Sequence, residues 1–137
     1  MTFLEFQQRL QEMIEIIPER FMKNLQGIHC FPEIKHSPEQ RGLVRMGEYL
    51  DPGFESFMAA GVHIGRHINI YYGSFVAVAR YNPDFDWEEQ LWETLTHELQ
   101  HHLESQANDQ SLIEWDKQQL EKFRAQQRTL PQWQDFS

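Results

Sequence analysis

The chain has 137 residues, enough for one modest hydrophobic core and too few for two. Hydrophobic residues make up 40% of the sequence and charged residues 24%, which is typical of a globular protein and excludes wholesale disorder. The formal net charge of -9 argues against nucleic acid or an anionic membrane surface as a partner, and no apolar run approaches the ~20 residues that cross a bilayer.

The single cysteine and the opening residues indicate the compartment. Cys30 has no partner for an intramolecular disulfide, which favours a reducing environment, and its place in the apolar run GIHCF predicts a buried, inert thiol. The opening MTFLEFQQRL lacks the basic start and unbroken apolar run of a secretory signal. We therefore expect a cytoplasmic protein with one domain over residues 1–137 and a flexible tail from about residue 129.

The first half of the chain reads as a helix followed by strands. Apolar residues at three- and four-residue spacing predict an amphipathic helix from Thr2 to about Leu25, with Thr2 and Glu5 at capping-box spacing. Pro18 should kink this helix or divide it into two. Strands are predicted in GIHCFPEI (27–34) and in LVRMGEYL (43–50), and Pro and Gly predict a loop over 51–65.

The second half begins with the clearest strand, Arg66 to Gly73. Its alternation places Ile68, Ile70 and Tyr72 on one face and His67, Asn69 and Tyr71 on the other. The following SFVAVARY (74–81) fits either a short helix or another strand. Helices should then cover Trp87 to about Gln106, with Asp86 as N-cap, and Ser111 to about Arg128. This order of elements predicts an α+β domain.

The helix predicted from Trp87 contains LTHELQHHLE, which includes H-E-x-x-H. On a helical wheel its apolar side chains form one stripe, while His97, His101 and Glu104 cluster on the far side. His102 falls inside the apolar stripe and is expected to be a histidine at the edge of the core. The residues of the stripe are Leu91, Trp92, Leu95, Leu99 and Leu103.

The spacing of His97 and His101 predicts a zinc site. Imidazoles four residues apart share one face of a helix, where both can bind a single ion at ~2.0–2.1 Å. Glu98 would project beside the ion and take a proton from a metal-bound water, whose pKa the metal lowers to about 7. The competing interpretation is a polar, solvated helix face.

With a leading helix, the strand HINIYYG and a helix bearing HELQHH, the chain resembles the minimal zincin-like metallopeptidase family of bacteria. The resemblance runs from about Thr2 to Asp116, and HELQHH is its specific part. It implies a small mixed or antiparallel sheet packed against an N-terminal helix, the H-E-x-x-H helix and a C-terminal helix. It also implies one Zn²⁺ per chain, held by His97 and His101, with Glu98 as catalytic base.

The third metal ligand departs from the pattern best known in this family, H-E-x-x-H-x-x-G-x-x-D. The positions of its Gly and Asp hold Glu104 and Ala107 here. Glu104 is the favoured replacement, because it lies one turn beyond His101 and helical side chains lean toward the N-terminus. It could equally orient a histidine N–H. The alternative ligands are Asp109, Glu114 and Asp116.

The resemblance also implies a substrate strand beside the active-site helix. Arg66–Tyr71 is the candidate for pairing with an extended peptide, which makes His67, Asn69 and Tyr71 candidate substrate-binding residues. The leading hypothesis is a zinc peptidase acting on an unidentified peptide or protein. The alternatives are a metal-binding or regulatory module whose H-E-x-x-H is degenerate, and an interaction protein that docks through its C-terminal helix.

Overall fold

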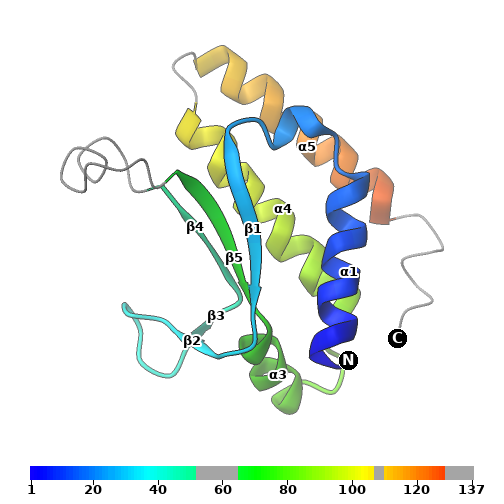
Figure 1. Ribbon diagram of the computed structural model, residues 1–137, viewed down its shortest axis with the longest axis vertical. Coiled ribbons are helices and arrows are strands. Elements are labelled where there is room, and N and C mark those ends of the chain that lie inside the picture. Colours follow the sequence, from blue (N-terminus) through cyan, green and yellow to red (C-terminus); the bar gives the residue numbers. More distant parts are fainter. Residues whose placement is uncertain (52–64, 107–109, 129–137) are drawn as a thin grey trace.

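The computed structural model describes the backbone of residues 1–51, 65–106 and 110–128, and the side chains of these residues except 110–116 and 128. The α+β class is confirmed (Figure 1). No helix in these ranges is both long and apolar enough to cross a membrane.

The N-terminal helix, α1 (Phe3–Ile16), begins at the predicted capping box. The Thr2 hydroxyl accepts the Glu5 N–H, and the Glu5 carboxylate accepts the Thr2 N–H. The helix ends where Ile17 turns extended, because Pro18 disfavours helical backbone in the residue before it. A short 3-10 helix, η1 (Glu19–Phe21), follows, so the predicted division at Pro18 is confirmed.

Among the described residues, the main sheet has three strands in the order β1-β5-β4. β1 (Leu25–Phe31) runs parallel to β5 (Arg66–Tyr71), and β4 (Gly47–Leu50) pairs with the other edge of β5 in the antiparallel sense. The strand predicted over 43–50 is divided at Met46. Its first part, β3 (Val44–Arg45), pairs instead with β2 (Lys35–His36) in a separate two-stranded sheet.

The position of β5 overturns one expectation. The resemblance predicts that Arg66–Tyr71 is an edge strand available to an extended peptide, but β1 and β4 occupy both of its edges. Strand addition to β5 is therefore excluded. Within the described residues, the edges of the main sheet belong to β1 and β4, and β4 packs closely against α4 at Gly47.

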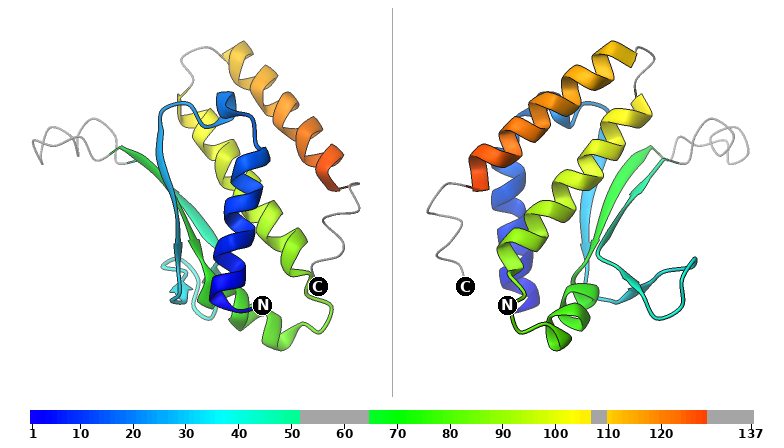
Figure 2. Two further views of the ribbon diagram at one scale, coloured as in Figure 1. Left: turned by 45° about the vertical axis from the view of Figure 1, so that its right-hand side comes forward. Right: turned by 180° about the vertical axis from the view of Figure 1, so that it is seen from behind.

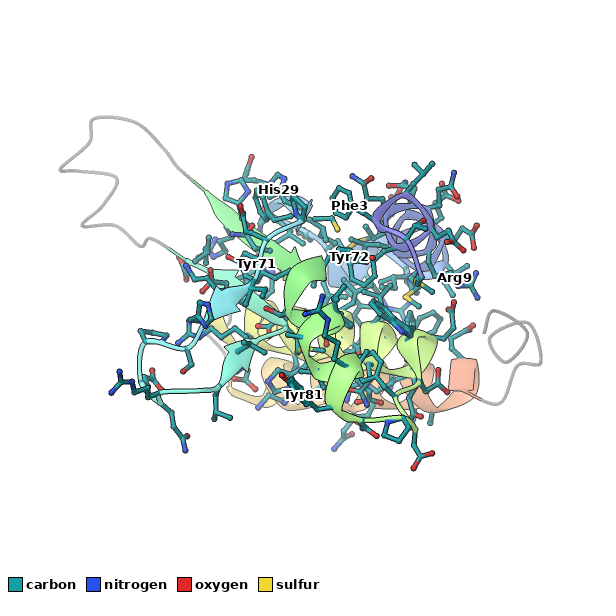
Figure 3. The ribbon with its side chains drawn as sticks, turned by 90° about the horizontal axis from the view of Figure 1, so that it is seen from below. Phe3, Arg9, His29, Tyr71, Tyr72 and Tyr81 are labelled. Atoms are coloured by element: carbon teal, nitrogen blue, oxygen red, sulfur yellow. The ribbon has the colours of Figure 1, made fainter. Side chains whose placement is uncertain are left out.

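Three further helices follow in the described part of the chain. α3 (Tyr72–Tyr81) shows that SFVAVARY is helical, so Tyr72 begins a helix instead of continuing the strand, and its ring lies 5.3 Å from that of Phe3 (Figure 3). α4 (Trp87–Gln106) carries the H-E-x-x-H motif, and Asp86 accepts the Glu89 N–H as the predicted N-cap. α5 (Gln110–Arg128) runs back along α4 (Figure 2).

The core lies between the sheet and the helices. α1, α4 and α5 lie on one side of the main sheet (Figures 1 and 2). Ile68 and Ile70 of β5 are fully buried in one core cluster with residues of these helices. The predicted apolar stripe of α4 is confirmed, since all its members are buried: Leu91, Trp92, Leu95, Leu99 and Leu103.

Candidate active site

His97 and His101 lie one turn apart on the exposed side of α4. Their Nε2 atoms are 3.1 Å apart, and the ring planes meet at 87°. Two nitrogens bound to one tetrahedral zinc ion are separated by about 3.3 Å. These two donors therefore fit a shared zinc ion. Partial loss of hydration lowers the pKa of His97, and the charges of His101 and Arg124 act in the same direction, which favours the neutral form that binds metal.

Glu98 lies on a different side of α4 and is buried, with 8% of its surface exposed. Burial is the main cause that raises the pKa of its carboxyl group, and the charge of Glu48 raises it further. His101, Arg45 and the backbone N–H of Tyr49 lower it, but burial prevails. A carboxyl group whose pKa is raised can both accept and return a proton near neutral pH.

The edge strand β4 passes unusually close to α4 at Gly47. A Cβ atom added there would lie 2.8 Å from Thr94 Cγ2 and 3.1 Å from the Asn69 carbonyl oxygen. Only glycine fits between the strand and the helix without displacing one of them. The motif helix is thereby held against an edge strand, one turn before Glu98.

The backbone of β4 turns toward α4 at alternate residues. The Tyr71 N–H donates to the Met46 carbonyl at 2.9 Å, so the backbone carbonyl of Met46 faces β5. In an antiparallel pair the alternation continues, and Gly47 and Tyr49 direct their N–H and C=O groups away from β5. The Tyr49 N–H is one of these outward groups, and as a hydrogen-bond donor it acts to lower the pKa of Glu98.

A cleft of about 610 Å³ separates β4 from α4. Two of its acidic side chains are paired with arginines: Glu48 lies 3.0 Å from Arg45 Nη1, and Asp51 lies 3.5 Å from Arg66, which is outside the cleft lining. The residues that line the cleft are Arg45, Gly47, Glu48, Tyr49, Asp51, Glu98, His101, Glu104 and Ser105.

Glu104 approaches His101 from the side away from His97. Its Oε2 atom is 3.8 Å from Nδ1 of His101, whereas the two histidines face each other through Nε2. Lys117 binds the same carboxylate at 2.9 Å, and this hydrogen bond is the main cause that lowers the pKa of Glu104. In this arrangement the carboxylate faces the nitrogen of His101 that does not face His97.

The remaining ligand candidates lie outside the described side chains. Asp109 is outside the described residues, and Glu114 and Asp116 are placed only by the backbone of α5. Among the side chains that are described, no group of three or more His, Cys, Asp or Glu residues is arranged to hold a metal. At this site, the described donors for zinc are thus the two imidazoles of α4.

The three predicted substrate-binding residues share the face of β5 that is turned away from the helices. Asn69 donates to the Tyr71 hydroxyl at 3.3 Å, and that hydroxyl donates to Glu48. Burial, followed by the hydrogen bond to Glu48, raises the pKa of Tyr71 to about 12. His67 lies farther along the strand beside His29, at 3.0 Å. Of the three, Tyr71 is linked to the cleft, through Glu48.

His102 is fully buried, as its place in the apolar stripe predicted. Burial is the main cause that lowers its pKa, which favours a neutral ring. Sequence reasoning missed the contributions of β4, where Gly47 and Tyr49 form the second wall of the cleft. The signal that could have revealed it is the glycine inside the strand-like run LVRMGEYL, because a glycine within a strand often marks a close backbone approach.

Comparison with known proteins agrees with this geometry. Residues 28–122 match the zincin-like metallopeptidase family. A solved structure, described as a conserved hypothetical protein from Thermus thermophilus, is 47% identical and superposes with a TM-score of 0.65 over 76% of this chain and 95% of its own. No curated protein matches the sequence. The chain therefore belongs to the zincin-like metallopeptidase family.

Proposed function

We propose that the protein is a zinc-dependent peptidase whose active site is the cleft between β4 and α4. One observation carries the proposal: two imidazole Nε2 atoms lie 3.1 Å apart on the helix that also buries the carboxylate of Glu98 under an edge strand. Metal binding alone does not require a carboxylate at Glu98. Proton transfer does require one.

The residues of α4 divide the chemistry between them. His97 and His101 hold the ion, which, when bound, polarises the scissile carbonyl and makes water more acidic. Glu98 accepts a proton from the attacking water at its carboxylate and returns it to the leaving amine nitrogen. The burial that raises the pKa of Glu98 supports both transfers.

The substrate is an extended peptide that pairs with β4. Gly47 turns its N–H and C=O groups toward the cleft, where a peptide can add to the sheet as a further strand. Tyr71 supports this wall through Glu48. His67 and Asn69 would contact parts of a substrate that continue onto the open face of the sheet.

The third ligand is proposed to come from the segment after α4. Glu104 is engaged by Lys117 and lies at Nδ1 of His101, which suits a carboxylate that orients the ring. Asp109, Glu114 and Asp116 follow α4 directly and remain the candidates for direct coordination. Replacing each by Ala should weaken zinc binding most at the true ligand.

A second function, a metal-binding module without catalysis, is favoured by one observation. The described side chains supply two metal donors instead of the usual three. Such a module would bind zinc through His97 and His101 and would be indifferent to Glu98.

Zinc content and one variant of Glu98 separate these functions. Elemental mass spectrometry of protein purified without chelators or a His-tag should find one zinc per chain, lost in both His97→Ala and His101→Ala. Glu98→Gln should keep the zinc and abolish hydrolysis of a peptide library. Unchanged hydrolysis by Glu98→Gln, or no zinc uptake at micromolar concentration, would contradict the peptidase.

A further inference from the structure

His102 uses both of its ring nitrogens in the interior of the protein. Nε2 lies 2.8 Å from the Lys23 carbonyl oxygen, and Nδ1 lies 2.9 Å from the Tyr49 hydroxyl. A carbonyl oxygen only accepts hydrogen bonds, so Nε2 carries the proton and Nδ1 accepts from Tyr49. The side-chain nitrogen of Gln106 also lies near this ring nitrogen, 2.9 Å from Nε2.

These two partners belong to different margins of the sheet. Tyr49 lies in β4, an edge strand of four residues that pairs on one side with β5. Lys23 lies in the segment that leads into β1, at the opposite margin. Through these two hydrogen bonds, the ring of His102 links α4 to both edges of the sheet.

Tyr49 connects His102 with the cleft. Its hydroxyl contacts His102 and, at 2.7 Å, Ser105, both of which belong to α4. Its backbone N–H is one of those that turn away from β5, and it acts as a hydrogen-bond donor that lowers the pKa of Glu98, which lines the same cleft. One residue therefore connects the buried ring of His102 with the carboxylate that the mechanism uses.

We propose that His102 is a positioning residue for Glu98, because it holds Tyr49 so that the N–H of the edge strand stays on the carboxylate and the cleft keeps its width. The catalytic consequence rests on the proposed function. The contact itself does not, and it can be tested without a substrate or a metal.

The first test is amide hydrogen exchange, measured by NMR on the full ¹⁵N-labelled chain. An edge-strand amide that faces outward exchanges rapidly unless something accepts its hydrogen. The amide of residue 49 should therefore be protected in the parent protein. It should lose at least tenfold of its protection in Glu98→Ala, which removes the acceptor, and in Tyr49→Phe, which removes only the hydroxyl.

The matched control is Tyr72→Phe. The Tyr72 hydroxyl donates to the Met1 carbonyl at 2.6 Å, away from the cleft, so this variant loses one hydroxyl hydrogen bond of the same kind. It should leave the protection of residue 49 within twofold of the parent. His102→Asn should retain protection that His102→Ala loses, because the Asn side-chain oxygen can occupy the place of Nδ1 and accept from Tyr49.

Each outcome of these experiments either supports or overturns the positioning role of His102. Selective loss at residue 49 in Tyr49→Phe and His102→Ala, with rescue in His102→Asn, supports the positioning role. Unchanged protection, or an equal loss at every amide of the sheet, overturns it in favour of a packing role. In zinc-loaded protein, Tyr49→Phe should lower kcat about tenfold at unchanged zinc content. Absence of hydrolysis in the parent protein would count against the proposed function and leave the exchange result to decide the contact.

Discussion

At the scale of single residues, the missing side chain of Gly47 sets the distance between the two walls of the cleft. Gly47→Ala would bring a Cβ atom to 2.8 Å from Thr94 Cγ2 and 3.1 Å from the Asn69 carbonyl. Overpacking of this kind costs about 1–3 kcal/mol of unfolding free energy. Urea denaturation should show this loss of stability. A separate peptidase assay should show lower activity, because the strand shifts relative to Glu98.

A second substitution checks that the clash is the cause. Thr94→Ser removes Cγ2 and keeps a hydroxyl that can donate to the Gln90 carbonyl, as Thr94 does at 2.7 Å. Combined with Gly47→Ala, it should restore part of the lost stability, and only part, because the contact with Asn69 remains. A Gly47→Ala protein as stable as the parent would show that β4 and α4 separate freely.

The residues best predicted from the sequence are those whose roles depend on local spacing. A helix fixes the angle between side chains, so the exposure of His97 and His101 and the burial of His102 followed from the wheel. Cys30, predicted to be buried, is only partly buried against the core, and that burial raises the pKa of its thiol to about 12. The motif predicts Glu98 beside the metal, but its burial under β4 depends on a strand distant in sequence and could not be read locally.

At the scale of elements, a buried ion pair joins the first helix to the motif helix. Arg9 of α1 binds Glu88 in the first turn of α4, and each has only 5% of its surface exposed. Burial is the main cause that raises the pKa of Glu88, and the hydrogen bond from Arg9 and its charge oppose it. Arg9→Ala leaves this carboxylate buried without its partner, which costs about 3–5 kcal/mol.

The destabilisation in Arg9→Ala should depend on pH. Without Arg9 the pKa of Glu88 rises further above its ordinary value of 4.5. A carboxyl group whose folded pKa is raised stabilises the fold below its unfolded pKa and loses that contribution as pH rises through the folded pKa. Urea unfolding should therefore show a smaller difference between variant and parent at pH 4.5 than at pH 8. An equal difference at both values would show that lost packing, and not the charge, causes the effect.

The order of the strands is where sequence reasoning failed, for a physical reason. Arg66–Tyr71 alternates between apolar and polar side chains because one face of the sheet packs on helices and the other carries His67, Asn69 and Tyr71. Such a pattern reports the two faces of a strand and says nothing about its two edges. Whether β5 is central depends on pairing with β1 and β4, which are distant in sequence.

At the scale of the whole molecule, two pairs of histidines could compete for zinc. Besides His97 and His101, the open face of the sheet brings His29 Nε2 to 3.0 Å from His67 Nδ1. The pair on α4 has Glu104 beside the outer nitrogen of His101 and Glu98 on the adjacent side of the helix. A carboxylate at the outer nitrogen fixes the ring and makes it a stronger ligand. We therefore expect zinc to bind on α4.

Thermal unfolding with and without zinc tests this choice. A ligand at one hundred times its Kd adds about 2.7 kcal/mol to the stability of the folded state. In a domain of this size that corresponds to a rise in Tm of roughly 10 °C. The rise should vanish in His101→Ala and persist in the double variant His29→Ala/His67→Ala. The reverse pattern would place the metal on the open face of the sheet, and the H-E-x-x-H helix would then be a polar face without a metal.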